Sequence, residues 1–284
     1  MTLHELRELL LSVPEDWKVV PLGELTDYLS RGISPQYVKA SNTLILNQKC
    51  IQPGGIHYEH MKFLDENVNL KGDSPVYIRS GDVVLNSTGT GTIGRPGYIA
   101  TVPAPVVADS HVTVIRTKEH LLSGAYLFRQ LSSPDIQLLL ETLTFTGSTN
   151  QVELSRTELS KFPIRLAPLN EQKQIERALS SIDEALEASK AVLEQLFLVK
   201  RQTAQELFSN DLAASKPSQY VKHFGYVPAG WQRSTVGEIS CFVTSGPRGW
   251  AQYYSDQGAA YLRIGDLSKS SIYLEPESTQ YLDC

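Results

Sequence analysis

One uninterrupted stretch in the second half of the chain limits what this sequence can fold into. From Asn170 to Phe208 there is no glycine and no proline. Apolar residues recur there at alternating steps of four and three, which is the heptad pattern of a coiled coil. At 1.5 Å per residue the stretch predicts a helix of roughly 58 Å, longer than an ordinary globular helix. We expect Asn170 to cap its start and residues 209–211 to end it.

The apolar positions of this stretch form a seam that needs a partner. A parallel row beside the seam is also apolar, so the stripe is wider than a two-stranded coiled coil requires. The alternative is an amphipathic helix that lies on its own globular domain. The length of the stretch favours a protruding spacer helix instead. The expected coiled-coil or oligomerisation residues are Ile175, Leu179, Ile182, Leu186, Leu193, Leu196 and Leu207.

The composition is that of a soluble protein of about two domains. The 284 residues are 41% hydrophobic and 20% charged, and no apolar run reaches the roughly 18 residues of a membrane span. The three cysteines are scattered, which favours a reducing cytoplasm. The net charge is −5, and no large segment has an excess of Lys and Arg. This balance argues weakly against nucleic-acid binding, unless another subunit supplies phosphate attraction.

A repeat with a shift of 214 residues organises the rest of the chain. Residues 13–18 (VPEDWK) recur as residues 227–232 (VPAGWQ), and Gly23-Glu24-Leu25 recurs as Gly237-Glu238-Ile239. With small gaps the match continues to Tyr281-Leu282-Asp283. We therefore expect a complete unit over residues 1–168 and a spacer helix over 169–211. A linker over 212–226 and the truncated start of a second unit over 227–284 would follow.

The complete unit is predicted to be an α+β module, with helices segregated from a mainly antiparallel sheet. Short apolar or alternating runs bounded by turn residues predict strands over 44–46, 76–79, 82–85, 98–100 and 111–115. Helices are expected over 121–130 and 136–143.

Residues 89–94 (GTGTIG) match the glycine pattern of dinucleotide-binding loops. Such a loop must lead into a helix, but Arg95-Pro96-Gly97 and a strand-like run follow. We interpret residues 89–94 as a tight hairpin turn that exposes backbone N–H groups, threonine hydroxyls and Arg95. The turn could contact phosphate or serve structure alone.

No catalytic or metal-binding motif stands out. His57 and His60 follow Cys50, but no second ligand pair occurs at zinc spacing, so we expect no metal. Asp109, Ser110 and His111 are adjacent in sequence and cannot converge as a triad. The lack of chemistry motifs favours a recognition or scaffold role without catalytic residues.

Three polar stretches are candidates for contact with DNA. Residues 31–39 combine basic, amide and aromatic side chains, residues 47–49 follow a predicted strand, and residues 144–151 form a polar run. Amides can pair with adenine edges, and hydroxyl and basic groups suit phosphates. Each stretch could equally be an ordinary surface loop. With the glycine-rich turn, the candidates are Arg31, Ser34, Gln36, Lys39, Asn47, Lys49, Thr88, Thr90, Arg95, Ser148, Asn150 and Gln151.

Taken in order, several runs resemble the specificity subunit of type I restriction–modification enzymes. Val13-Pro14-x-x-Trp17 with Gly23-Glu24 resembles the start of a target-recognition domain in that family. Residues 46–51 (LNQKCI), 81–94 (GDVVLNSTGTGTIG) and 108–112 (ADSHV) are similar to later parts of it. Residues 157–164 leading into 168–172 (PLNEQ) resemble the junction with the conserved helix. The resemblance carried by these runs extends over nearly the whole chain.

The resemblance implies a non-catalytic subunit that reads double-stranded DNA. In the family, two target-recognition domains lie at opposite ends of an antiparallel helix pair, and each reads half of a bipartite site. The helices dock methyltransferase subunits, which bind S-adenosylmethionine and methylate adenine, and a translocating restriction subunit can join. No cofactor is expected on this chain itself.

This sequence departs from the family pattern because it lacks most of the second recognition domain and the second helix. A homodimer through antiparallel helices would restore the arrangement and read an interrupted palindrome. The rival hypothesis is a coiled-coil scaffold that does not read DNA directly.

Overall fold

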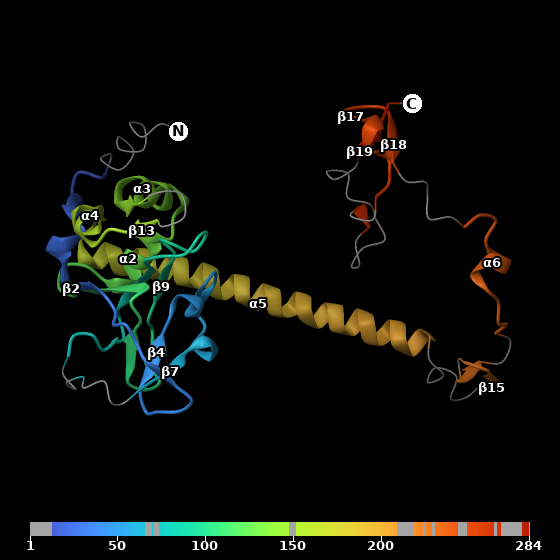
Figure 1. Cartoon of the computed structure of the whole chain (residues 1–284), viewed down its shortest axis with the longest axis horizontal. Helices are drawn as coiled ribbons and strands as arrows, with labels where there is room; N and C mark the ends of the chain where they lie inside the picture. The colour runs from blue at the N-terminus through green and yellow to red at the C-terminus, as the bar shows by residue number, and fades with distance from the viewer. Residues whose placement is uncertain are drawn as a thin grey trace. The chain divides into compact units, whose positions relative to one another are not determined.

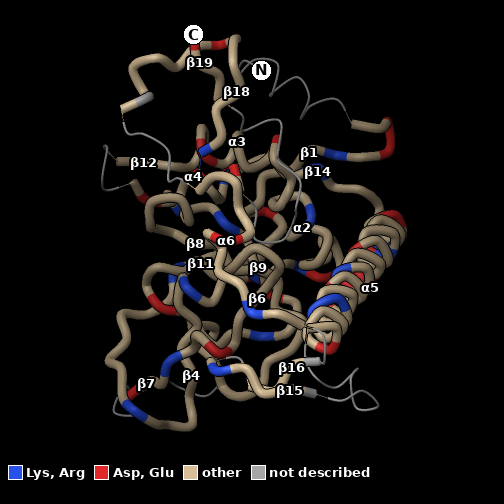
Figure 2. Tube along the Cα trace, turned by 90° about the vertical axis from the view of Figure 1, so that its right-hand side faces the viewer, with Lys and Arg blue, Asp and Glu red and all other residues tan. Residues whose placement is uncertain are grey.

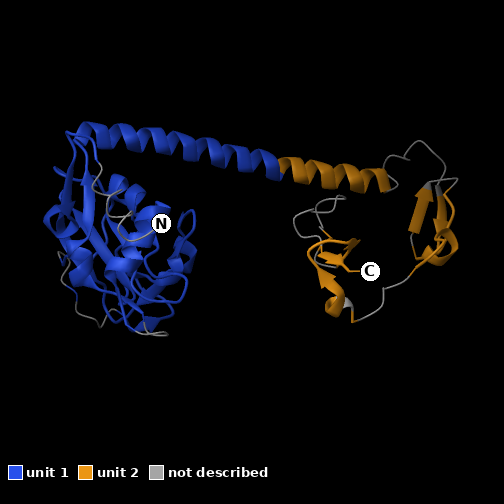
Figure 3. Cartoon of the chain, turned by 90° about the horizontal axis from the view of Figure 1, so that it is seen from above, with its two compact units in different colours: residues 1–194 blue, residues 195–284 orange. Residues whose placement is uncertain are grey.

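The computed structural model describes residues 13–65, 70, 74–147, 152–208, 218–223, 225–228, 231–243, 249–263, 266–267 and 280–283 (Figure 1). The chain forms two compact units, residues 1–194 and 195–284, which divide within the long helix (Figure 3). Each unit is described by itself.

A four-stranded antiparallel sheet lies at the centre of unit 1. Its strand order is β2 (Thr26–Arg31), β11 (Val112–Thr117), β8 (Val83–Asn86) and β9 (Pro96–Tyr98). All four residues of β8 are buried, because both faces of the sheet are covered. Val83 and Leu85 pack into a helical layer, and Val84 packs into the core on the opposite face. The alternation of strand side chains thus divides one apolar run between two cores.

The helical layer contains α2 (Gly124–Leu131), α3 (Pro134–Thr144), α4 (Arg156–Lys161) and the short 3₁₀ helix η1 (Leu22–Leu25). Ser123, Ser133 and Ser155 cap the three α-helices, each accepting a hydrogen bond from a first-turn N–H. β1 (Lys18–Pro21) pairs with β14 (Pro163–Leu166) and joins the two ends of the domain.

A second sheet covers the other face of the central one. Its order is β10 (Val106–Ala108), β4 (Leu44–Leu46), β7 (Lys62–Leu64) and β3 (Tyr37–Val38), with one parallel pair, β10–β4. Two small antiparallel pairs complete the unit: β5 (Ile51–Gln52) with β6 (Gly55–Ile56), and β12 (Phe145–Thr146) with β13 (Glu153–Leu154). The α+β class predicted from the sequence is confirmed.

Two predicted strands differ from the structure. Residues 76–79 alternate like a strand and bury Val76 and Ile78, but they form only an isolated bridge at Tyr77. The strand expected at 98–100 lies earlier, as β9, and Ile99 bonds back to the carbonyl of Asp82 beyond the ladder. In both places apolar alternation reports burial, which does not require a hydrogen-bonded ladder.

The predicted long helix is confirmed as α5 (Leu169–Phe208), 40 residues in length. Its first turn is anchored to unit 1: Gln172 is buried, and Trp17 Nε1 donates to Glu171 Oε2 at 2.9 Å. The N–H of Gln172 bonds to the carbonyl of Pro168, so Asn170 lies inside the first turn and is not the predicted cap. The expected stop at 209–211 lies outside the described residues.

Only the first turns of α5 pack on unit 1. Ile175, predicted as a seam residue, packs against the domain's helical core, whereas the seam from Leu179 to Leu207 is exposed. The helix therefore lies on its own domain at one end and leaves the domain beyond it. Among the described residues, no helix is both long enough and apolar enough to span a membrane.

Unit 2 repeats the local structure of the start of unit 1. Its strands β17 (Tyr254–Ser255), β19 (Gln280–Leu282) and β18 (Ala259–Tyr261) form an antiparallel sheet in the order β17-β19-β18, as β3-β7-β4 do. A helical turn, α6 (Val236–Ile239), stands where η1 stands in unit 1. The predicted linker region also contains structure, since β15 (Ser218–Val221) and β16 (Gly225–Pro228) form a hairpin.

The two copies differ in burial. Leu22 and Leu25 of η1 are 0% and 2% exposed, whereas Val236 and Ile239 at the equivalent positions are 65% and 74% exposed. In unit 1 these side chains pack with α2, α4 and β14. The described part of unit 2 therefore has the apolar residues of a core without the helices that would cover them.

Candidate nucleic-acid interface

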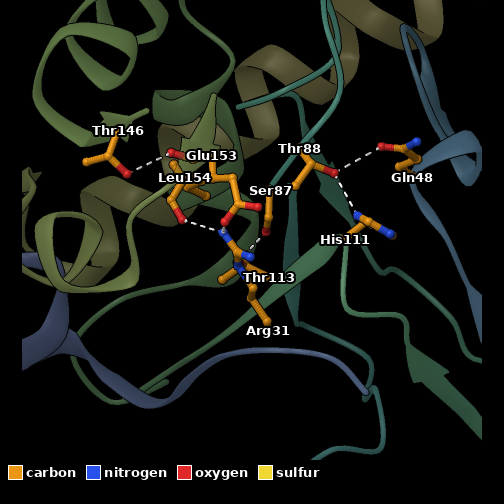
Figure 4. A network of polar contacts seen from close by, with 9 residues as sticks. All are labelled: Arg31, Gln48, Ser87, Thr88, His111, Thr113, Thr146, Glu153 and Leu154. Atoms are coloured by element: carbon orange, nitrogen blue, oxygen red, sulfur yellow. Dashed lines mark hydrogen bonds and ion pairs between the residues drawn. The ribbon is translucent and has the colours of Figure 1, made fainter. Parts of the chain in front are cut away.

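Strand register brings distant polar residues to one end of the central sheet. β11 runs antiparallel to both β2 and β8, and Thr113 pairs with Arg31 on one side and Leu85 on the other. The C-terminal ends of β2 and β8 therefore meet the start of β11. The side chains at this edge form the network drawn in Figure 4, which we call the sheet-end network: Arg31, Gln48, Ser87, Thr88, His111, Thr113, Thr146, Glu153 and Leu154.

The sheet-end network has a buried part and a solvent-exposed part. Ser87 Oγ and Thr113 Oγ1 are buried and 2.6 Å apart. Above them, Thr88 Oγ1 lies 2.9 Å from Nδ1 of the exposed His111 and 3.5 Å from Gln48 Oε1 (Figure 4). Gln48 and His111 offer donors and acceptors of the kind that read base edges. Gln48 lies within the predicted stretch 47–49, although it was not among the individual candidates, and His111 was not predicted to contact DNA. The proximity of Gln48 and His111 depends on strand register, which the sequence does not show.

Arg31 is the basic residue of this network. Its Nη2 bonds to Glu153 Oε2 and to the carbonyl of Leu154, both at 3.0 Å. Because Glu153 is exposed, the ion pair is weak and a phosphate could compete for the guanidinium. The structure thus places Arg31 on the predicted surface but gives it a carboxylate partner.

The loop after Arg31 carries exposed candidates beside a buried acid. Ser34, Gln36 and Lys39 are exposed, and Tyr37 hydroxyl donates to Asp109 Oδ2 at 3.4 Å. Burial raises the pKa of Asp109, although the backbone N–H of His111 favours its charged form. Burial and the nearby Asp109 raise the pKa of Tyr37.

Of three other residues predicted to contact DNA, two are exposed and the third is bonded within the protein. Lys49 and Thr90 are exposed as expected. Arg95 is held by the carbonyls of Ile51 and Gly91, each at 3.2 Å, so it clamps the glycine-rich turn to β5. The turn leads directly into β9, and no helix begins among the described residues 87–95, as predicted.

Asn47 differs from its predicted surface position. It is 5% exposed, its Nδ2 donates to the carbonyl of His60, and its Oδ1 accepts from the N–H of Lys49. Both ends of the amide are therefore used inside the protein, where it caps the 3₁₀ helix η2 (Gln48–Cys50). Asn47 supports the loop that presents Gln48.

Ser148, Asn150 and Gln151 lie outside the described residues. Their loop joins β12 to β13, and the described residues beside it include Thr146 and Glu153, whose hydroxyl and carbonyl are 3.4 Å apart. Both residues belong to the sheet-end network, so the described residues that flank 148–151 lie at this surface (Figure 4).

A second surface follows α5. Arg129 of α2 pairs with Asp183 at 2.5 Å. Five seam residues beside and beyond this contact are more than half exposed: Ile182, Leu186, Leu193, Leu196 and Leu207. A groove of about 600 Å³ lies between α5 and the turns around Gly54 and Gly91, and Leu186 lines it. Acidic and basic residues are both distributed along the helix (Figure 2). Exposed apolar residues thus recur along one face of a charged helix.

A family model described as the type I restriction modification DNA specificity domain matches residues 14–196. The chain belongs to this family. The match covers more than half of the chain, including the whole sheet-end network and the first part of α5.

Two relatives of this specificity-domain protein come from Methanocaldococcus jannaschii. The MjaVIII specificity subunit is 22% identical over 276 residues, covering 94% of this chain and 59% of the relative. The putative MjaX specificity subunit is 21% identical over 269 residues, covering 93% of this chain and 62% of the relative. The chain therefore spans about three fifths of their length.

A solved structure on complex assembly and conformational transition of the type I R-M system contains a similar fold. The match has a TM-score of 0.50 and 20% identity, and it covers 88% of this chain and 61% of that chain. It supports the fold assignment.

Proposed function

We propose that this protein is the non-catalytic DNA-recognition subunit of a type I restriction–modification complex. Unit 1 reads one half of a bipartite target through the sheet-end network and the loops around it. α5 docks an adenine methyltransferase subunit, which carries S-adenosylmethionine, and can also recruit a restriction subunit in the cytoplasm. The observation that carries the proposal is a domain of the specificity family joined to a long helix whose apolar stripe is exposed.

We further propose that two copies pair through antiparallel α5 helices. Fully burying a leucine or isoleucine side chain is worth about 1.5–3 kcal/mol, so the exposed seam provides a substantial driving force for pairing. The two-fold axis would place identical recognition domains at opposite ends of the pair. The DNA target would then be an interrupted palindrome.

Light scattering on the full chain tests the pairing. Leu193 lies near the middle of the seam, and Leu198, which is equally exposed, lies on another face of the helix. We expect Leu193→Glu to be monomeric and Leu198→Glu to remain dimeric at the same concentration. A wild-type chain that is monomeric both alone and with the methyltransferase subunit would contradict the homodimer.

Genome-wide mapping of methylated adenine tests the recognition role. The chain is co-expressed with its methyltransferase subunit, and a symmetric gapped motif is expected. Gln48→Ala and His111→Ala should relax or change that motif, whereas the Leu198→Glu chain should retain it. An asymmetric motif would indicate a second specificity chain. The scaffold hypothesis would be favoured by two results together. Adenine methylation would be complete when this chain is absent, and the complex of this chain with the methyltransferase subunit would show no salt-dependent DNA binding.

A further inference from the structure

Three potential metal ligands meet on a short 3₁₀ helix, η3 (Tyr58–His60), and the residue that precedes it. One donor atom each from His57, Glu59 and His60 lies within 4.8 Å of the others. A 3₁₀ helix has three residues per turn, so side chains at i and i+3 eclipse one another. The rings of His57 and His60 are accordingly stacked, with centroids 6.0 Å apart and an interplanar angle of 16°. Glu59 Oε1 lies 2.7 Å from His57 Nδ1.

The backbone beneath these side chains is held by hydrogen bonds. The N–H of His57 bonds to the carbonyl of Cys50 at 2.8 Å, and the carbonyl of His60 accepts from Asn47 Nδ2 at 2.9 Å. Tyr58 hydroxyl donates to the carbonyl of Thr101 at 2.8 Å. The buried side of the loop is therefore anchored, while the three donor side chains remain accessible to solvent. An anchored backbone lowers the conformational cost of gathering ligands around an ion.

The donor set suits a divalent transition metal. Two imidazoles and one carboxylate are ligands that zinc accepts, with bonds of about 2.0–2.2 Å. Ligand atoms around such an ion are separated by about 3.3 Å, so side-chain rotation must bring these donors closer together.

We propose that His57, Glu59 and His60 bind one divalent transition-metal ion of the zinc class. Three protein ligands leave a fourth position for water or an anion. Cys50 is not part of the site, because it is fully buried and burial raises the pKa of its thiol to about 11. This proposal departs from the sequence-based expectation of no metal at His57 and His60. That expectation rested on the lack of a second ligand pair at zinc spacing, whereas these three ligands come from four consecutive residues.

The proposal is tested by titrating Co²⁺ into the full chain, which is purified without a histidine tag. We expect one equivalent to produce the visible absorption of a low-symmetry cobalt site and Zn²⁺ to displace it. His57→Ala, His60→Ala and Glu59→Gln should each weaken binding by about tenfold or more.

The matched control is His120→Ala, an exposed histidine elsewhere in unit 1. It should bind Co²⁺ like the wild type, and circular dichroism of every variant should match that of the wild type. A second readout is thermal unfolding, in which Zn²⁺ should raise the midpoint of the wild type and of His120→Ala but not of His60→Ala. The proposal fails if no saturable binding occurs, or if His60→Ala binds Co²⁺ as tightly as His120→Ala.

Discussion

Gln172 holds the long helix to unit 1, and its removal gives the sharpest test of the structure. The side chain is fully buried at the first turn of α5. Its Nε2 donates to the carbonyls of Leu121 and Ala167 at 2.9 and 2.8 Å, and its Oε1 accepts from the N–H of Ser123 at 2.9 Å. One amide thus connects α5, the β14–α5 turn and the start of α2.

Gln172→Ala would leave two carbonyls and one N–H without these partners. Each buried polar group that loses its partner costs about 1–3 kcal/mol. The low end applies because Leu121 is 38% exposed and water can reach this region once the side chain is gone. We expect unfolding of unit 1 to become easier by about 3 kcal/mol.

Urea unfolding of the full chain measures this loss. Replacing Trp231 and Trp250 by phenylalanine leaves Trp17 as the reporter, since the chain has three tryptophans and Trp17 bonds to Glu171 beside the junction. Gln174→Ala, an exposed glutamine on the next turn, is the matched control and should stay within about 0.5 kcal/mol of the wild type. Equal costs for Gln172→Ala and Gln174→Ala would refute the reasoning.

Three further outcomes follow from buried groups in unit 1. Asp82 is 1% exposed and accepts two hydrogen bonds from Arg116, at 2.9 and 2.7 Å, so Asp82→Ala should destabilise the fold by about 3–5 kcal/mol in urea unfolding, while the exposed Asp27→Ala should not. Burial raises the pKa of Asp109, so its charged form destabilises the fold above that pKa. As the pH falls from neutral through the raised pKa toward the ordinary value, the wild type should gain stability relative to Asp109→Asn. A stability difference between the two proteins that does not change with pH would contradict this. In a Cys284→Ser background a thiol reagent should label the exposed Cys241 quickly and the buried Cys50, whose pKa is about 11, only on unfolding; mass spectrometry of quenched samples decides.

The sequence by itself determined the features that depend on local periodicity. The heptad spacing predicted α5 and its exposed stripe, because a 3.6-residue helix places those positions on one face wherever the helix lies. The repeat predicted that residues around Gly237 would resemble those around Gly23, and α6 and η1 confirm this at the level of local conformation. The glycine-rich turn was also recognisable, since Pro96 and a following strand exclude a helix there.

Only the tertiary structure decided which polar residues share a surface. Arg31 and Glu153 are 122 residues apart in sequence, and their ion pair exists because β2, β11 and the β12–β13 pair meet at one sheet end. The same long-range packing buried Asn47, placed Ile175 against the domain core and left the seam beyond it exposed. A sequence pattern specifies which face a residue occupies on its own element, whereas strand register and packing specify what that face meets.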